Sequence, residues 1–82
     1  MRILVDGVTP TGVHVVVREP ETQRYEIDID GQQVPYTSAT RLRDGGTTTI
    51  QTNLGEIHAH RQMRTEAWDT FNGERLTPRN DT

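Results

Sequence analysis

The segment from Tyr25 to Tyr36 limits what this chain can fold into more than any other part of the sequence. It places Asp30-Gly31 between two runs in which polar and apolar residues alternate. Asp-Gly favours a type I′ hairpin turn, because both central positions of that turn need a positive φ. The turn predicts three cross-strand pairs: Ile29 with Gln32, Ile27 with Val34, and Tyr25 with Tyr36.

This hairpin has two chemically different faces, because side chains alternate along a strand. The apolar face carries Tyr25, Ile27, Ile29, Val34 and Tyr36. The opposite face carries three acids, Glu26, Asp28 and Asp30, and is a candidate interaction surface for an arginine-rich partner. A slip of one residue would exchange the faces, so the turn and the pattern predict the same register. The acids also resemble the start of a calcium-binding loop, but Thr37 stands where such a loop needs glutamate.

Other short segments rich in β-branched residues are separated by Gly, Pro, Asn and Asp. They predict strands over residues 2–5, 13–18, 39–43, 47–52, 56–63, 67–71 and 74–78. No window of ten or more residues shows a helical apolar period, although residues 62–71 could hold a short helix. We therefore predict an all-β domain over residues 1–78, with a frayed tail at 79–82. Its fold is a small antiparallel meander of seven or eight strands, closing as a barrel or as two packed sheets.

Two further turns predict how the middle strands pair. Asp44-Gly45-Gly46 would place Leu42 beside Thr48 and Thr40 beside Ile50. A turn at Leu54-Gly55 would place Ile50 near Ala59 and Thr52 near Ile57. Ile57, Ala59 and Met63 would then face the core.

The composition indicates a domain with little apolar material. The chain has 82 residues, of which 30% are hydrophobic, and no cysteine. A domain of this size buries only about 60% of its unfolded surface. We expect either a thin core or one that is completed against a partner, and favour the second. No apolar run is long enough for a membrane span or a signal peptide, so we expect a soluble, cytoplasmic protein without membrane contact.

The basic residues offer an alternative function. The net charge is −3, and all nine basic residues are arginine. Arg41, Arg43, Arg61 and Arg64 could line a small barrel that binds single-stranded nucleic acid. Only 5% of the residues are aromatic, and the negative charge argues against a dedicated nucleic-acid binder.

His58 and His60 supply a second alternative. On a strand both imidazoles project from the same face as Glu56, and such a set can hold Zn, Fe or Mn with one or two further ligands. The simpler interpretation is a solvated polar face, so we predict no bound metal and no cofactor.

Trp68 is the single tryptophan, and its two interpretations are a core residue and an anchor that fills a pocket on a partner. Catalytic residues are scarce: Ser38 is the single serine, and no general base stands at a recognisable spacing from it. We therefore predict no enzymatic activity.

Three segments carry a family resemblance: Tyr-x-Ile-x-Ile-Asp-Gly, Gly-Glu-Ile-His-Ala and Ala-Trp-Asp-Thr-Phe-Asn-Gly. Their pattern of strand and turn residues is similar to that of the antiparallel strands beside the biotin carrier in acyl-CoA carboxylases. The chain lacks the Met-Lys-Met motif that carries biotin. The resemblance therefore implies an accessory β-barrel and no carboxylase role.

Together these features favour a non-enzymatic β module that acts through protein–protein contact. Its partner would be another protein or a second copy of itself, because unpaired sheet edges accept further strands. An accessory or structural subunit, a decoration protein, and an inhibitor of a larger complex of the kind that phages and mobile elements encode all fit this description.

Overall fold

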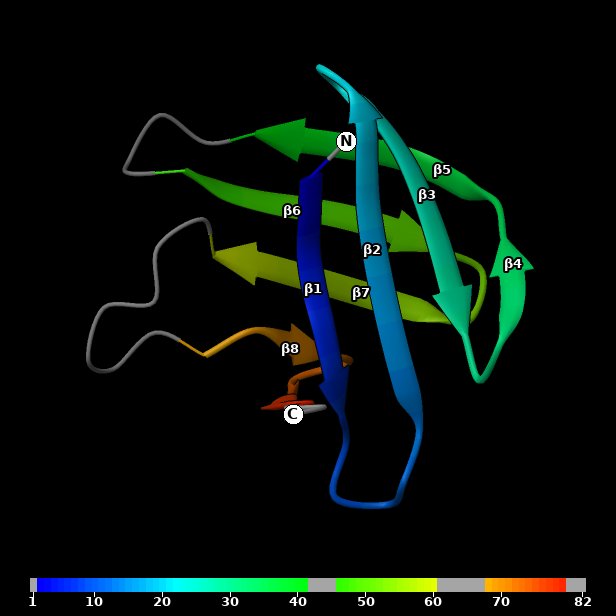
Figure 1. Ribbon diagram of the computed structural model, residues 1–82, viewed down its shortest axis with the longest axis vertical. Coiled ribbons are helices and arrows are strands. Elements are labelled where there is room, and N and C mark those ends of the chain that lie inside the picture. Colours follow the sequence, from blue (N-terminus) through cyan, green and yellow to red (C-terminus); the bar gives the residue numbers. More distant parts are fainter. Residues whose placement is uncertain (1, 42–45, 61–67, 80–82) are drawn as a thin grey trace.

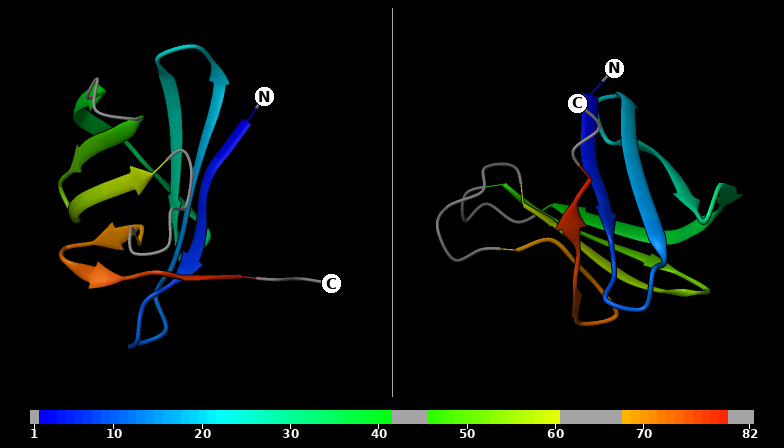
Figure 2. Two further views of the ribbon diagram at one scale, coloured as in Figure 1. Left: turned by 90° about the vertical axis from the view of Figure 1, so that its left-hand side faces the viewer. Right: turned by 60° about the horizontal axis from the view of Figure 1, so that its bottom comes forward.

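The computed structural model describes residues 2–41, 46–60 and 68–79, which form two packed antiparallel sheets of five strands each (Figures 1 and 2). The first sheet has the order β10-β1-β2-β3-β4. Its strands are β1 (Arg2–Val8), β2 (His14–Glu21), β3 (Arg24–Ile29), β4 (Gln32–Val34) and β10 (Thr77–Pro78). The second sheet has the order β5-β6-β7-β8-β9. Its strands are β5 (Tyr36–Arg41), β6 (Thr47–Thr52), β7 (Gly55–His60), β8 (Thr70–Phe71) and β9 (Glu74–Arg75).

The all-β prediction with two packed sheets is confirmed, whereas the sheets in the described part of the chain do not close into the alternative barrel. β1, β2 and β3 cross β5, β6 and β7 steeply (Figure 1), as in orthogonal sheet packing. The number of strands exceeds the prediction because the C-terminal hairpin is divided into three strands of two residues each. The strand predicted over 39–43 begins earlier, at Tyr36, directly after Pro35.

The hairpin at Asp30-Gly31 forms as predicted. Asp30 and Gly31 have φ values of 52° and 84°, as a type I′ turn requires. Ile29 pairs with Gln32, and Ile27 pairs with Val34. The local turn chemistry therefore sets the register of β3 and β4.

The predicted pairing of Tyr25 with Tyr36 is wrong. Proline has no N–H to continue the ladder, and the chain leaves the first sheet at Pro35. Tyr36 begins β5 and pairs with Thr52 in the second sheet. The two tyrosine rings still meet edge to face, with their centroids 5.9 Å apart, so the contact joins the sheets.

The core lies between the sheets, and both contribute to it. Its buried residues are Val5, Val15, Val17, Tyr25, Ile27, Ile29, Val34, Ile50, Ile57, Ala59, Phe71 and Leu76. The apolar face predicted for the hairpin therefore lies in the core, apart from the partly buried Tyr36.

The predicted register of β6 and β7 is wrong by two residues. Ile50 pairs with Ile57, and Thr48 pairs with Ala59, because the two-residue turn is Asn53-Leu54. A shift of two leaves every side chain on its expected face, so Ile57 and Ala59 are buried as predicted. Met63 lies outside the described residues.

The predicted register of β5 is wrong by one residue, which exchanges its faces. Ala39 pairs with Ile50, and Arg41 pairs with Thr48. Every residue of β5 after Tyr36 is exposed, so burial specifies its register only weakly. Leu42 and the turn through Gly45 lie outside the described residues.

The C-terminal segment crosses from the second sheet back to the first. The Leu76 side chain is buried, and its N–H donates to the Asp69 carbonyl oxygen (2.8 Å). Pro78 then pairs with Gly7, where a Cβ would lie 3.0 Å from the Leu76 Cβ. Arg79, which we predicted to belong to a frayed tail, donates its N–H to the Asp6 carbonyl oxygen (2.9 Å).

One buried carboxylate links β1, β2 and the turn after β2. Glu19 accepts a hydrogen bond from Arg2 (2.8 Å) and another from the N–H of Gln23 (2.9 Å). The Gln23 hydrogen bond, together with the charge of Arg2, lowers the pKa of Glu19 from its ordinary 4.5. A lowered pKa in the folded state stabilises the fold above the ordinary pKa, and this stability is lost as the pH falls through the lowered value.

We therefore expect Glu19→Gln to flatten the acid limb of the stability profile. The free energy of unfolding of the variant should vary less than that of the wild type below about pH 4.5, measured by urea denaturation. Glu21→Gln, on the same strand but exposed, is the matched control and should keep the wild-type slope. An unchanged acid limb in Glu19→Gln would contradict this assignment.

Candidate functional site

β5 is the longest edge strand in the described part of the protein. It lies at the outer side of the second sheet (Figure 1) and pairs only with β6 among the described strands. Tyr36 is half-buried, and the five residues from Thr37 to Arg41 are exposed. β4, β9 and β10 also end their sheets, but they have only three, two and two residues. The backbone of β5 is thus the largest unpaired hydrogen-bonding edge among these four strands.

The sequence of β5 does little to block a further strand. Natural edge strands are blunted by lysine, proline, bulges or short length. β5 reads Tyr-Thr-Ser-Ala-Thr-Arg, with one charge at its end and no proline. Its one irregularity is a register shift between Tyr36 and Ser38, so the pairing from Ser38 to Arg41 is regular. This segment can accept a strand from a partner.

A hollow of about 400 Å³ lies beside the start of β5, at the place where the chain leaves the first sheet. It is lined by Tyr25, Glu26, Ile27, Gln33, Val34, Pro35 and Tyr36. Burial raises the pKa of Tyr25, so this phenol is neutral at physiological pH. The hollow is a largely apolar recess next to an open strand edge.

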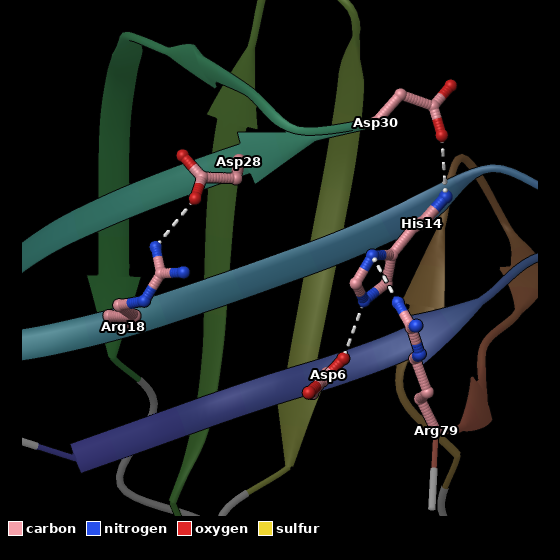
Figure 3. A network of polar contacts seen from close by, with 6 residues as sticks. All are labelled: Asp6, His14, Arg18, Asp28, Asp30 and Arg79. Atoms are coloured by element: carbon pink, nitrogen blue, oxygen red, sulfur yellow. Dashed lines mark hydrogen bonds and ion pairs between the residues drawn. The ribbon is translucent and has the colours of Figure 1, made fainter. Parts of the chain in front are cut away.

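The acidic face of the hairpin is present, but it is partly neutralised (Figure 3). Arg18 donates to Asp28 (2.7 Å), and this hydrogen bond raises the pKa of the Arg18 guanidinium. The carboxylate of Asp30 accepts the backbone N–H of His14 (3.0 Å). Glu26 pairs across the strands with Arg18. Two of the three predicted interaction residues therefore already have partners within the sheet.

His14 is the centre of a polar network that sequence reasoning missed (Figure 3). Its Nε2 lies 2.6 Å from Asp6, and Arg79 donates to its Nδ1 (3.2 Å). Because a guanidinium has only donors, Nδ1 accepts and Nε2 carries the proton shared with Asp6. The pairing of β1 with β2 could have suggested Asp6, but no local signal pointed to a residue 65 positions away.

The outer face of the second sheet carries polar side chains in register. One row crosses all five strands: Thr40, Thr49, His58, Thr70 and Arg75. Within this face His58 Nε2 lies 2.9 Å from Glu56, whereas His60 Nδ1 lies 3.3 Å from the hydroxyl of Thr47. No group of three or more metal-ligating residues forms in the described ranges. The predicted histidines share a face, and each contacts a different neighbour.

Trp68 is half-buried and stacks against an arginine. The Arg75 guanidinium carbon lies 3.3 Å from the centroid of the ring. This cation–π contact joins Trp68 to β9, so one face of the indole is already covered. Neither of the two interpretations drawn from the sequence included this contact.

The predicted arginine patch is represented in the structure by one residue. Arg41 aligns with the buried Thr48, and its charge helps to lower the pKa of Glu19 in the first sheet. Arg43, Arg61 and Arg64 lie outside the described residues.

A second hollow, of about 310 Å³, lies along β1 where β1 faces the C-terminal segment. It is lined by Ile3, Leu4, Val5, Asp6, Gly7, His60, Asp69, Leu76 and Pro78. We call it the Asp69 hollow. The Asp69 carboxylate accepts the N–H of His60 (2.7 Å), and burial raises its pKa. Sequence reasoning missed this residue, because it lies beside β1 only through the packing of the two sheets, which brings β7 against β1.

None of the described segments forms a helix with the length and apolar character needed to span a membrane. A comparison of the chain with protein-family models, with curated proteins and with solved structures returns no match.

Proposed function

We propose that this protein is a non-enzymatic module that binds a partner protein by strand addition at β5. The observation that carries the proposal is the open edge of β5, where five consecutive residues are exposed and only the last is charged. In strand addition, the main-chain hydrogen bonds supply affinity, and pockets beside the edge supply specificity. The second sheet would gain a sixth strand outside β5.

The recess beside Tyr36 supports this mode of binding. An added strand that runs along β5 past Tyr36 reaches the hollow lined by Tyr25, Val34 and Pro35. A bulky apolar side chain of the partner would bury its surface there and would set the register. Large apolar side chains seated in pockets contribute most of the energy in many protein interfaces.

The proposal fits an accessory or structural subunit, a decoration protein and an inhibitor of a larger complex equally well. A second copy of the chain could also supply the strand, because antiparallel pairing of β5 with itself places no charged residue opposite another: Arg41 of each copy would lie near Tyr36 of the other.

The test is to select peptides from a displayed library against the protein and to locate the bound peptide by hydrogen exchange. We expect protection of the exposed β5 amides between Thr37 and Arg41. We also expect N-methylation at alternate peptide residues to abolish binding in one of the two possible phases, because only every second N–H faces β5. Methylation in the other phase is the matched control.

Peptides that bind with equal affinity after methylation in either phase would contradict strand addition. Protection from hydrogen exchange that is confined to residues outside β5 would also contradict strand addition. Steeply salt-dependent binding of single-stranded oligonucleotides, without any peptide bound at β5, would favour the arginine-based alternative instead.

A further inference from the structure

The Asp69 hollow combines apolar walls with negative charge. Leu4, Leu76 and Pro78 supply apolar surface, and the ionisable residues that line it are Asp6, Asp69 and His60. No arginine of the described ranges lines the hollow, although Arg79 lies close by at His14. A ligand that complements these walls is apolar along its length and positively charged at its end.

Asp69 has hydrogen-bonding capacity to spare. Among the described residues its side chain accepts one hydrogen bond, from the His60 N–H to Oδ1. A carboxylate offers about four acceptor positions. Asp6 is engaged differently, because its Oδ1 lies 2.6 Å from His14 Nε2. Asp69 is therefore the carboxylate in the hollow that can take a further donor.

The occupied Oδ1 of Asp69 favours one kind of cation. A guanidinium binds a carboxylate best through two parallel hydrogen bonds, one to each oxygen. An ammonium is a compact charge that binds through a single oxygen. Since the His60 N–H already takes one acceptor position of Oδ1, a bidentate guanidinium would have to share that oxygen, whereas an ammonium needs only Oδ2. The site therefore suits a primary ammonium better than a guanidinium.

The open half of β1 provides a place for the chain that carries such a group. β1 pairs with β10 only at Gly7 and Val8. On that side, Arg2 to Val5 have no strand partner among the described residues, whereas the Asp6 carbonyl oxygen already accepts the Arg79 N–H. Ile3 is exposed. An extended peptide along this edge would hold a lysine over the hollow.

We propose that the Asp69 hollow binds a lysine side chain of an extended peptide. The methylene stem packs against Leu4, Leu76 and Pro78, and the ammonium donates to the free oxygen of Asp69. Long basic side chains bind in this way, with the stem on apolar surface and the charge at its end. The site lies on β1, away from β5, so it goes beyond the strand addition proposed above and does not depend on it.

The test is an NMR titration of the labelled full chain with the peptide acetyl-Ala-Lys-Ala-amide. The matched peptide replaces lysine by norleucine, which keeps the apolar stem and lacks the ammonium. We expect the lysine peptide to shift the Leu4 and Leu76 methyl signals, the His60 amide and the Asp69 carboxyl carbon. The norleucine and arginine peptides should bind at least about tenfold more weakly.

Asp69→Asn should weaken binding of the lysine peptide at least about tenfold, whereas the exposed control Glu21→Gln should bind as the wild type does. If Asp69→Asn does not fold, the shift of the Asp69 carboxyl carbon in the wild-type protein still decides the question. Equal binding of the lysine and norleucine peptides would overturn the proposal. Equal binding of lysine and arginine, or shifts confined to the acidic face around Asp28, would overturn it as well.

Discussion

Replacing Ile27 by alanine is expected to lower the free energy of unfolding by about 2–5 kcal/mol. Ile27 lies on β3 between Val17 and Val34, and its side chain is fully buried. The substitution removes three carbons at the centre of the core and leaves a cavity that the two sheets cannot fill without moving. In a small domain this is a large share of the total stability. Urea denaturation followed by circular dichroism measures the change.

Ile3→Ala is the matched control, because it makes the same chemical change at a side chain that is 60% exposed. We expect it to lower the free energy of unfolding by less than about 1 kcal/mol. A similar loss in both variants would mean that the core does not lie between the sheets as described.

Replacing Gly55 by alanine is expected to lower the free energy of unfolding by about 2–4 kcal/mol, because the substitution strains the backbone and breaks hydrogen bonds. Gly55 has a φ of 155°, and a Cβ there would lie 2.6–2.7 Å from the side chain of Asn72. Asn72 connects two turns, since its Oδ1 accepts the N–H of Glu56 and its Nδ2 donates to the Leu54 carbonyl oxygen. The added methyl group displaces this side chain.

Gly73→Ala separates strain from displacement. Gly73 also has a positive φ, of 77°, but a Cβ there meets nothing within 4 Å. The loss in free energy of unfolding of Gly73→Ala should come from backbone strain alone. It should be smaller than the loss of Gly55→Ala in the same denaturation experiment. If the two variants lose equal stability, the contact between Gly55 and Asn72 contributes nothing.

The accuracy of the sequence predictions depended on how far apart the interacting residues lie. Asp30-Gly31 determines its own turn, and the alternation around it determines which side chains of β3 and β4 enter the core. The β6–β7 pairing was wrong by two residues because the turn begins at Asn53, but the faces were right. β5 was wrong by one residue, because an exposed edge strand has no burial to specify its faces.

The candidate sites were likewise predictable only where the interacting residues lie close together in the sequence. The sequence placed Glu56, His58 and His60 on one polar face, which the strand period alone determines. It could not show that Asp28 has Arg18 as a partner, or that Arg75 covers Trp68. It also gave no sign of the Asp69 hollow, whose walls come from β1, β7 and the C-terminal segment.

The sequence by itself determined that the chain forms antiparallel strands, where the central hairpin turns, and which hairpin residues are buried. These properties depend on φ preferences and side-chain alternation over a few residues. Only the tertiary structure decided that the chain changes sheets at Pro35 and again at Leu76, so that β5 becomes an open edge, and that the packing of the two sheets brings Asp69 beside β1. The physical reason is that both crossings are set by how two twisted sheets bury a shared core, which no local pattern encodes.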